Sequence, residues 1–166
     1  MKGYKAFKKS KVKTSSKDFV KISSSGDFAQ ICSSGNYAQI SLSGDYAQIN
    51  SSGEFSQISS SGYLTKIISS GDFTRIISSG DFTQIGSSGD YARIASTGEN
   101  SVICCAGANG AVKAKKGSWI VLSEWKPDKT RRRHIPVCVK TEFVDGEKIK
   151  ADTFYKLENG KFVECK

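Results

Sequence analysis

The hydrophobic and polar positions of this chain recur in units of nine residues. In residues 44–52, GDYAQINSS, a glycine is followed by an acidic residue, an aromatic ring, a small residue, Gln, Ile, a variable residue and two serines. The isoleucine position is filled at every step of one series: Ile22, Ile31, Ile40, Ile49, Ile58, Ile67, Ile76, Ile85, Ile94 and Ile103. A short fixed period is typical of repeat proteins, whose units are stable only when they stack on their neighbours.

The residues around each isoleucine predict a short strand. Two residues before it the side chain is small or β-branched, and two residues after it stands Ser, except at Leu42 and Cys105. Small, Ile and small side chains at alternate positions indicate a strand face that packs into a narrow interior. Because nine is odd, an uninterrupted strand would turn successive isoleucines to opposite faces, so each unit must contain a corner. We assign the corner to the Ser-Ser-Gly-Asp tetrad, where Gly permits a positive φ and Asp or Ser bonds backbone amides.

The repeats therefore predict an all-β chain that forms a parallel β-solenoid (a β-roll or β-helix). Two strands per coil give an 18-residue turn with two facing sheets, and three give a 27-residue triangular turn. A core of one Ile with small flanking residues favours the two-sided coil, because it is too thin for a wide interior. The repeats would then form about five coils stacked at ~4.8 Å, with the handedness left open.

The chain divides into three predicted segments. Residues 1–16 form a basic N-terminal arm or cap, residues 17–107 the nonapeptide solenoid, and residues 108–166 a C-terminal cap. In the last segment, residues 118–125 and 135–143 alternate like strands. Asp145-Gly146 and Asn159-Gly160 are hairpin signals, each followed by a short strand, 147–150 and 161–164. We expect a small antiparallel β-meander that closes the open end of the solenoid. Its predicted mini-core consists of Trp119, Trp125, Phe154, Tyr155 and Phe162.

The aromatic and Gln positions of the unit should point outward if the isoleucines point inward. The aromatic side chains would form ladders along the sheets, interrupted at Leu64: Phe19, Phe28, Tyr37, Tyr46, Phe55, Phe73, Phe82 and Tyr91. Stacked rings and Gln amides reinforce a parallel sheet, so a structural role is the first interpretation. The alternative is a docking or homodimer face, with these candidate residues: Tyr37, Tyr46, Phe55, Phe73, Phe82 and Tyr91.

The net charge of +9 is concentrated at the two ends of the chain. Residues 1–16 hold six lysines and no acid, residues 17–107 five basic and eight acidic residues, and residues 108–166 fourteen basic and eight acidic residues. The candidate partner-binding residues are Lys8, Lys9, Lys11, Lys13, Lys126, Lys129, Arg131, Arg132 and Arg133. Such clusters can neutralise phosphates or meet an acidic protein, and the alternative is a solvated arm and hairpin tip.

Catalytic and cofactor chemistry is not indicated. The single histidine, His134, has no nucleophile placed beside it, and the five cysteines form no CxxC pair. We expect no cofactor and no structural metal. Calcium at the acidic corners is a weaker alternative, because Asp27 and Asp45 would lie one coil apart while each corner offers one carboxylate. No apolar stretch follows the N-terminal lysines, so no secretion signal or membrane span is predicted.

Three parts of the sequence together resemble an uncharacterised family of nonapeptide-repeat proteins from bacteriophages and prophages of gut Firmicutes. These parts are the opening MKGYKAF, the SSGDYAQI-type repeats, and the closing VDGEKIK (144–150) with FYKL (154–157). Longer members of that family carry an extra N-terminal domain, which this chain lacks. The resemblance implies a viral or mobile-element origin and supplies no catalytic residues. The unpaired cysteine spacing and the lack of a predicted secretion signal make a reducing cytoplasm, here that of a bacterial host, the expected compartment.

We therefore expect a non-enzymatic phage-encoded protein that docks on and inhibits a host protein or nucleoprotein complex. A nucleic-acid-handling defence complex is one such target, which would make the chain anti-CRISPR-like. Two alternatives stay open: a structural component of a virion or adhesion apparatus, and a direct nucleic-acid binder.

Overall fold

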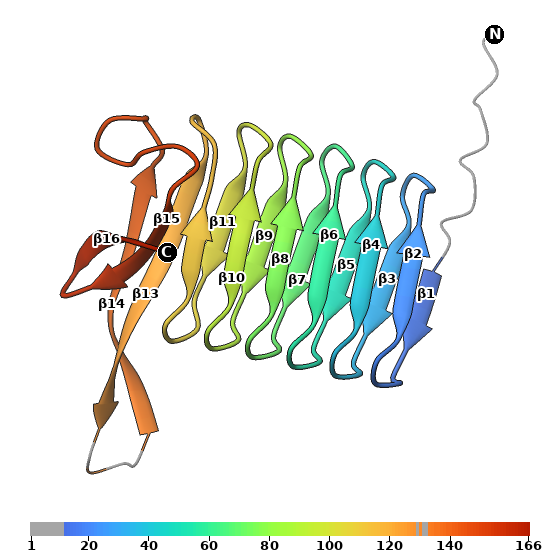
Figure 1. The fold of residues 1–166 in the computed structure, drawn as a ribbon, viewed down its shortest axis with the longest axis horizontal. Coiled ribbons are helices and arrows are strands. Elements are labelled where there is room, and N and C mark those ends of the chain that lie inside the picture. The colour runs from blue at the N-terminus through green and yellow to red at the C-terminus, as the bar shows by residue number, and fades with distance from the viewer. Residues whose placement is uncertain (1–11, 129, 131–132) are drawn as a thin grey trace, which may run out of the picture.

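Each nine-residue unit forms one four-residue strand, and successive strands alternate between two facing sheets (Figure 1). The structure is a computed structural model, and it describes residues 12–128, 130 and 133–166. Sheet A contains β1 (Val12–Ser15), β3 (Gln30–Ser33), β5 (Gln48–Ser51), β7 (Lys66–Ser69), β9 (Gln84–Ser87), β11 (Val102–Cys105), β13 (Trp119–Asp128) and β14 (Arg133–Phe143). Sheet B contains β2 (Lys21–Ser24), β4 (Gln39–Leu42), β6 (Gln57–Ser60), β8 (Arg75–Ser78), β10 (Arg93–Ser96), β12 (Ala111–Lys113), β15 (Phe154–Glu158) and β16 (Lys161–Cys165).

The strands of the solenoid pair in parallel with a register of 18 residues. Ile31 of β3 lies opposite Ile49 of β5, and Ile40 of β4 lies opposite Ile58 of β6. The predicted β-solenoid is confirmed, and the register shows that its coil has two sides. The solenoid has about 6 turns, because β1, β12 and the first half of β13 join the stack on either side of the regular repeats. Parallel pairing therefore runs from residue 12 to residue 122.

The core is a single seam of isoleucines between the two sheets. Each repeat isoleucine is buried, and the seam continues through Val112 of β12 and Ile120 of β13. Its flanks are small residues such as Ala47 and Thr65, which let the two sheets approach closely. In β1 the isoleucine position is taken by Lys13, whose ammonium group donates a hydrogen bond to the backbone oxygen of Ser23.

The corner glycines are required for close packing and not for a positive φ. The prediction that Gly supplies the positive φ is wrong, because that conformation falls two residues later, on the aromatic position, with φ between 52° and 56° from Phe19 to Tyr91. A Cβ atom on Gly71 would lie 2.0 Å from the backbone oxygen of Gly53 in the preceding coil. Backbone therefore lies directly on backbone at the corners from Gly35 to Gly107, and only glycine fits there.

The aspartate side chains of the corners accept hydrogen bonds from the backbone of the next coil. Asp72 Oδ1 accepts the backbone N–H of Asp90 at 2.8 Å, and Asp90 Oδ1 accepts that of Ala108 at 2.7 Å. The carboxylate thus satisfies an amide that no strand partner reaches. Among the described residues no group of three or more His, Cys, Asp or Glu side chains is placed to hold a metal ion.

The antiparallel strands at the C-terminus are divided between the two sheets. β14 pairs with β13 at the end of sheet A, while β15 and β16 form a hairpin that pairs with β12 at the end of sheet B. The hairpin at Asn159-Gly160 is confirmed, with φ of 49° and 68° at these two residues. The hairpin and strand predicted at Asp145-Gly146 are wrong, since residues 146–149 form bends and no strand follows before β15.

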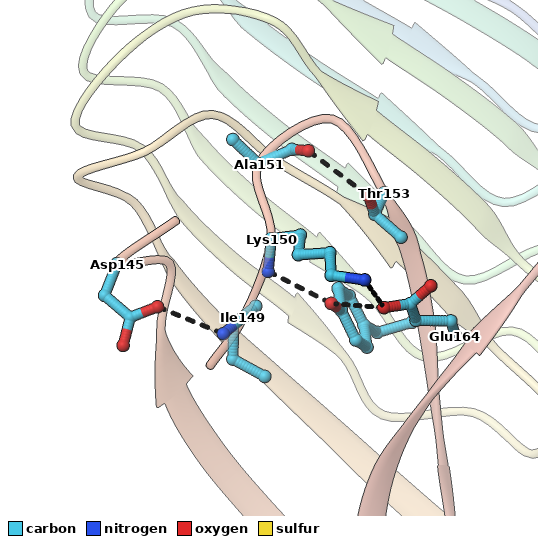
Figure 2. A network of polar contacts seen from close by, with 7 residues as sticks. Asp145, Ile149, Lys150, Ala151, Thr153 and Glu164 are labelled. Atoms are coloured by element: carbon cyan, nitrogen blue, oxygen red, sulfur yellow. Dashed lines mark hydrogen bonds and ion pairs between the residues drawn. The ribbon is translucent and has the colours of Figure 1, made fainter. Parts of the chain in front are cut away.

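Side-chain acceptors explain the bends after Asp145 (Figure 2). Asp145 Oδ1 accepts the backbone N–H groups of Glu147 at 2.9 Å and Ile149 at 3.0 Å, and these bonds hold the pKa of Asp145 below its ordinary value. The Lys150 N–H donates to the Tyr155 hydroxyl at 3.0 Å, and the Lys150 ammonium pairs with Glu164 at 2.9 Å. The same hydrogen bond lowers the pKa of Glu164 and raises that of Lys150.

The corner contact can be tested with two glycine substitutions. We predict that Gly71→Ala lowers the free energy of unfolding by about 2–3 kcal/mol or more, because its Cβ meets the Gly53 carbonyl. Gly86→Ala is the control, since its Cβ would meet nothing within 4 Å, and it should stabilise the protein by about 0.4–1 kcal/mol. Urea unfolding measures both. Equal stabilities of the two variants would contradict the close-packed corner.

The Asp145 bonds should depend on pH. The folded-state pKa of Asp145 is lowered, so its contribution to stability is present above the ordinary pKa and is lost as the pH falls through the folded value. We predict that the amide protection factor of Ile149 decreases as the pH falls from about 6 to about 2. Asp145→Asn keeps the acceptor and should remove this dependence. An unchanged pH profile in that variant would show that another group is responsible.

Candidate docking surfaces

The aromatic positions form two ladders at the corners of the coil and not on the sheet faces. One corner carries five rings, each stacked on the next with centroids 4.8–5.1 Å apart and planes within 7° of parallel: Phe19, Tyr37, Phe55, Phe73 and Tyr91. In the other corner Phe28 stacks on Tyr46, and Leu64 interrupts the series as predicted. There Tyr63 instead lies edge-on to Tyr46 at 6.1 Å and to Phe82 at 5.6 Å.

The ladders favour the structural role. Stacking covers both faces of an inner ring such as Phe55, so about two fifths of its surface stays exposed, largely at the ring edge. The ladders also lie at opposite corners, because one follows the strands of sheet A and the other those of sheet B. The predicted docking face is therefore split, with Tyr37, Phe55, Phe73 and Tyr91 on one side and Tyr46 and Phe82 on the other. Dimerisation through either side stays a prediction.

The predicted basic residues are placed only in part. Lys8, Lys9, Lys11, Lys129, Arg131 and Arg132 lie outside the described residues. Lys13 belongs to the first coil, while Lys126 and Arg133 lie on the β13–β14 hairpin at the other end of the rod, so the structure does not bring the two groups together (Figure 1). The hairpin extends beyond the edge of the stack (Figure 1). Lys126 pairs with Glu124 at 3.3 Å, and Arg133 is exposed.

Glu124 fixes the two C-terminal hairpins to each other. Its carboxylate accepts a hydrogen bond from the Gly160 N–H at 2.8 Å and forms an ion pair with Lys126. The Gly160 bond is the main reason why the pKa of Glu124 lies below its ordinary value. The Trp125 indole N–H donates to the backbone oxygen of Ala106 at 2.9 Å. The Gly160 bond joins β13 to the turn between β15 and β16, and the Trp125 bond joins β13 to the loop after β11, so both have a structural role.

An apolar cluster on the outer face of sheet A was not predicted. Trp119 is 47% exposed there, opposite Val102 of β11 on one side and Phe143 of β14 on the other. The Trp119 and Phe143 rings lie 5.1 Å apart. We define the sheet A patch by its exposed apolar members: Ile68, Val102, Trp119, Val139 and Phe143. Of the predicted mini-core, Tyr155 is buried and Phe162 packs on the core, but Trp119 faces outward.

Acidic residues near the sheet A patch are confined to β13 and β14, which contain Glu124, Asp128 and Glu142. Gly86 leaves a shallow hollow of about 560 Å³ between Lys66, Ile68, Val102 and Cys104. Strands β1, β3, β5, β7, β9 and β11 contain no Asp or Glu. Five of their twelve outward positions carry Gln, Asn or Thr and one carries Lys66, while two of the large apolar residues, Ile68 and Val102, belong to the patch.

Comparison of the chain with protein-family models, with curated proteins and with solved structures finds no match. The functional conclusion therefore depends on the geometry of the molecule.

No helix in the described part of the chain is long and apolar enough to cross a membrane. The described nucleophiles include Cys105, but burial raises its pKa to about 12 and keeps this thiol protonated.

The structural role of the ladders predicts a difference between two equivalent substitutions. Phe55 and Phe19 share the same φ within a degree, and Asn already occupies this position at Asn100. Phe55→Asn and Phe19→Asn therefore relieve the same backbone strain. Phe55 loses two stacked neighbours and Phe19 loses one among the described residues. We predict that Phe55→Asn is the less stable variant by about 0.5–1.5 kcal/mol in urea unfolding. Equal losses would show that the rings do not stabilise one another.

Proposed function

We propose that the chain is a non-enzymatic binding protein, in which the solenoid is a rigid rod and the sheet A patch docks on a partner protein. The observation that carries the proposal is the contact of Trp119 with Phe143, next to exposed Val102. Isolated exposed apolar residues are ordinary, whereas a cluster with two aromatic rings is typical of the centre of a protein interface.

The charges near the sheet A patch favour a partner with an acidic surface. Lys66 lies on the same face as Val102, two strands away. Lys126 of β13 and Arg133 of β14 lie at the ends of these strands that are joined by the hairpin turn. Basic residues around an apolar centre increase the rate of association with an acidic partner and discriminate against basic ones. Lys126 contributes less than an unpaired cation, because it already faces Glu124.

The host context of the proposal comes from the sequence resemblance. A phage-encoded protein without catalytic residues acts by occupying its target, so we propose inhibition of a host protein or nucleoprotein complex in the bacterial cytoplasm. A nucleic-acid-handling defence complex is one such target, which would make the chain anti-CRISPR-like. A rigid rod suits this role because little conformational entropy is lost on binding.

Two valines at the same repeat position provide the test. Val102 lies in the sheet A patch, and Val12 is its exposed equivalent in the first coil. Tagged wild-type chain should capture a protein from a lysate of a Firmicutes host. In a binding assay with that purified protein, Val102→Asp should weaken the affinity about 30-fold or more, because a charge in an apolar interface is unpaired.

Val12→Asp should leave this affinity unchanged, and thermal unfolding must show that both variants fold. Equal affinities of the two variants would contradict docking through the sheet A patch. A wild-type dimer in sedimentation that Val102→Asp converts to a monomer would show that a second copy covers the patch.

A further inference from the structure

The outer face of sheet B carries a row of cations and amides in strict register. The first residue of each strand lies beside the first residue of the next, in the order Lys21, Gln39, Gln57, Arg75 and Arg93. Neighbouring strands are separated by ~4.8 Å, so the row follows the axis of the rod with one polar group per step. Ser23, Ser41 and Ser59 form a second exposed row beside it.

This face is electropositive although the repeats as a whole are acidic. Strands β2, β4, β6, β8, β10 and β12 contain no Asp or Glu, while Lys113 of β12 adds a further cation. The acidic residues of the repeats all lie at the corners, where carboxylates such as that of Asp45 accept backbone N–H groups. Positive charge therefore faces outward, and negative charge is held at the two edges of the coil.

The row forms the floor of a groove. Lys21, Gln39, Gln57 and Arg75 line it together with Ile77, and its volume is about 390 Å³. It is shallow and runs across four strands, so it fits an extended chain better than a compact ligand. Lys156 of β15 and Lys161 of β16 lie at the C-terminal end of sheet B, with Glu158 paired to Lys156 at 3.2 Å.

We infer that the outer face of sheet B binds the phosphate backbone of a single-stranded nucleic acid. A regular row of cations and hydrogen-bond donors matches a polymer that repeats one anion, and a flexible single strand can adjust its phosphates to the row. A protein partner is disfavoured here, because Ile77 is the one exposed large apolar residue that lines the groove, and the isoleucines beneath it are buried in the core. This inference does not depend on the sheet A patch.

Not every cation on this face is equally available. Arg93 lies over the Phe154 ring at 4.3 Å and donates to the backbone oxygen of Lys166 at 2.8 Å, so it also holds the C-terminal strand in place. Arg75 is exposed on β8. Substitution of Arg75 therefore tests binding with little effect on the fold.

The repeat supplies a matched pair of substitutions. Gln is the residue found at this position in Gln39 and Gln57, so Arg75→Gln should fold normally. Lys66→Gln removes one charge at the same repeat position on the opposite sheet. The probe is a fluorescently labelled oligothymidylate of about 20 nucleotides, long enough to follow the rod. Its affinity is measured by anisotropy between about 50 and 200 mM salt.

We predict that the affinity of the wild type for the oligonucleotide falls as the salt concentration rises. Arg75→Gln should reduce the slope of log K against log salt by about 0.7, because one phosphate contact is lost. Lys21→Gln with Arg75→Gln should reduce it by about twice that amount. Lys66→Gln and Val102→Asp should match the wild type, which separates this face from the sheet A patch. Unchanged melting temperatures are the control for folding.

Three results would overturn the inference. Equal slopes for Arg75→Gln and Lys66→Gln would place the contact on the basic ends of the chain. Binding of the oligonucleotide that does not depend on salt, or no binding at all, would exclude a contact with its phosphate backbone. Tighter binding of polyglutamate than of the oligonucleotide, with the same dependence on Arg75, would identify an acidic protein as the ligand of this face.

Discussion

The contact between corner glycines of successive coils is the constraint on which the structure depends. Across the corners from Gly35 to Gly107, an added Cβ would lie 1.9–2.0 Å from a backbone oxygen of the preceding coil. Any larger residue would push the coils apart and break the hydrogen bonds between them, such as Gln48 N–H to Ala29 O at 2.8 Å. The period of nine residues is therefore set by backbone packing, and the isoleucine seam is filled within the space that this packing leaves.

A consequence is that the outward strand positions carry little of the folding free energy. On sheet A the same backbone position holds Gln48 in β5, Lys66 in β7 and Val102 in β11, all in one parallel register. The corner residues have less freedom, since the glycine contact recurs from Gly35 to Gly107 and most corners also carry an aspartate acceptor and an aromatic ring. Apart from Arg93, which also holds the C-terminal strand, departures from Gln such as Val102 and Arg75 are not required by the register, and this supports the proposal that both faces bind partners.

The sequence allowed the repeat and the coil to be predicted but not the role of each corner residue. Gly and the aromatic residue lie two positions apart, and general preference assigns the positive φ to Gly. Only the stacking of coils shows that Gly71 needs space while Phe73, with a φ of 55°, adopts the left-handed conformation. Trp119 was assigned to the mini-core and its outward position was not predicted, because Ile120 follows Ile103 by 17 residues instead of 18, and this shorter step concealed that β13 continues the stack.

The two proposed surfaces lie on opposite sides of a thin rod, and this arrangement restricts what the protein can bind. Facing sheets pack about 10 Å apart, and their outer faces point in opposite directions. One compact partner therefore cannot cover both without wrapping around the aromatic corners. A nucleoprotein complex can, if the rod lies between its protein and an exposed single strand. Since the rod is rigid, binding at one face places the other at a fixed distance, so the second contact forms at a high effective concentration. Two modest contacts would then give tight binding to the assembled complex and weak binding to its separate components.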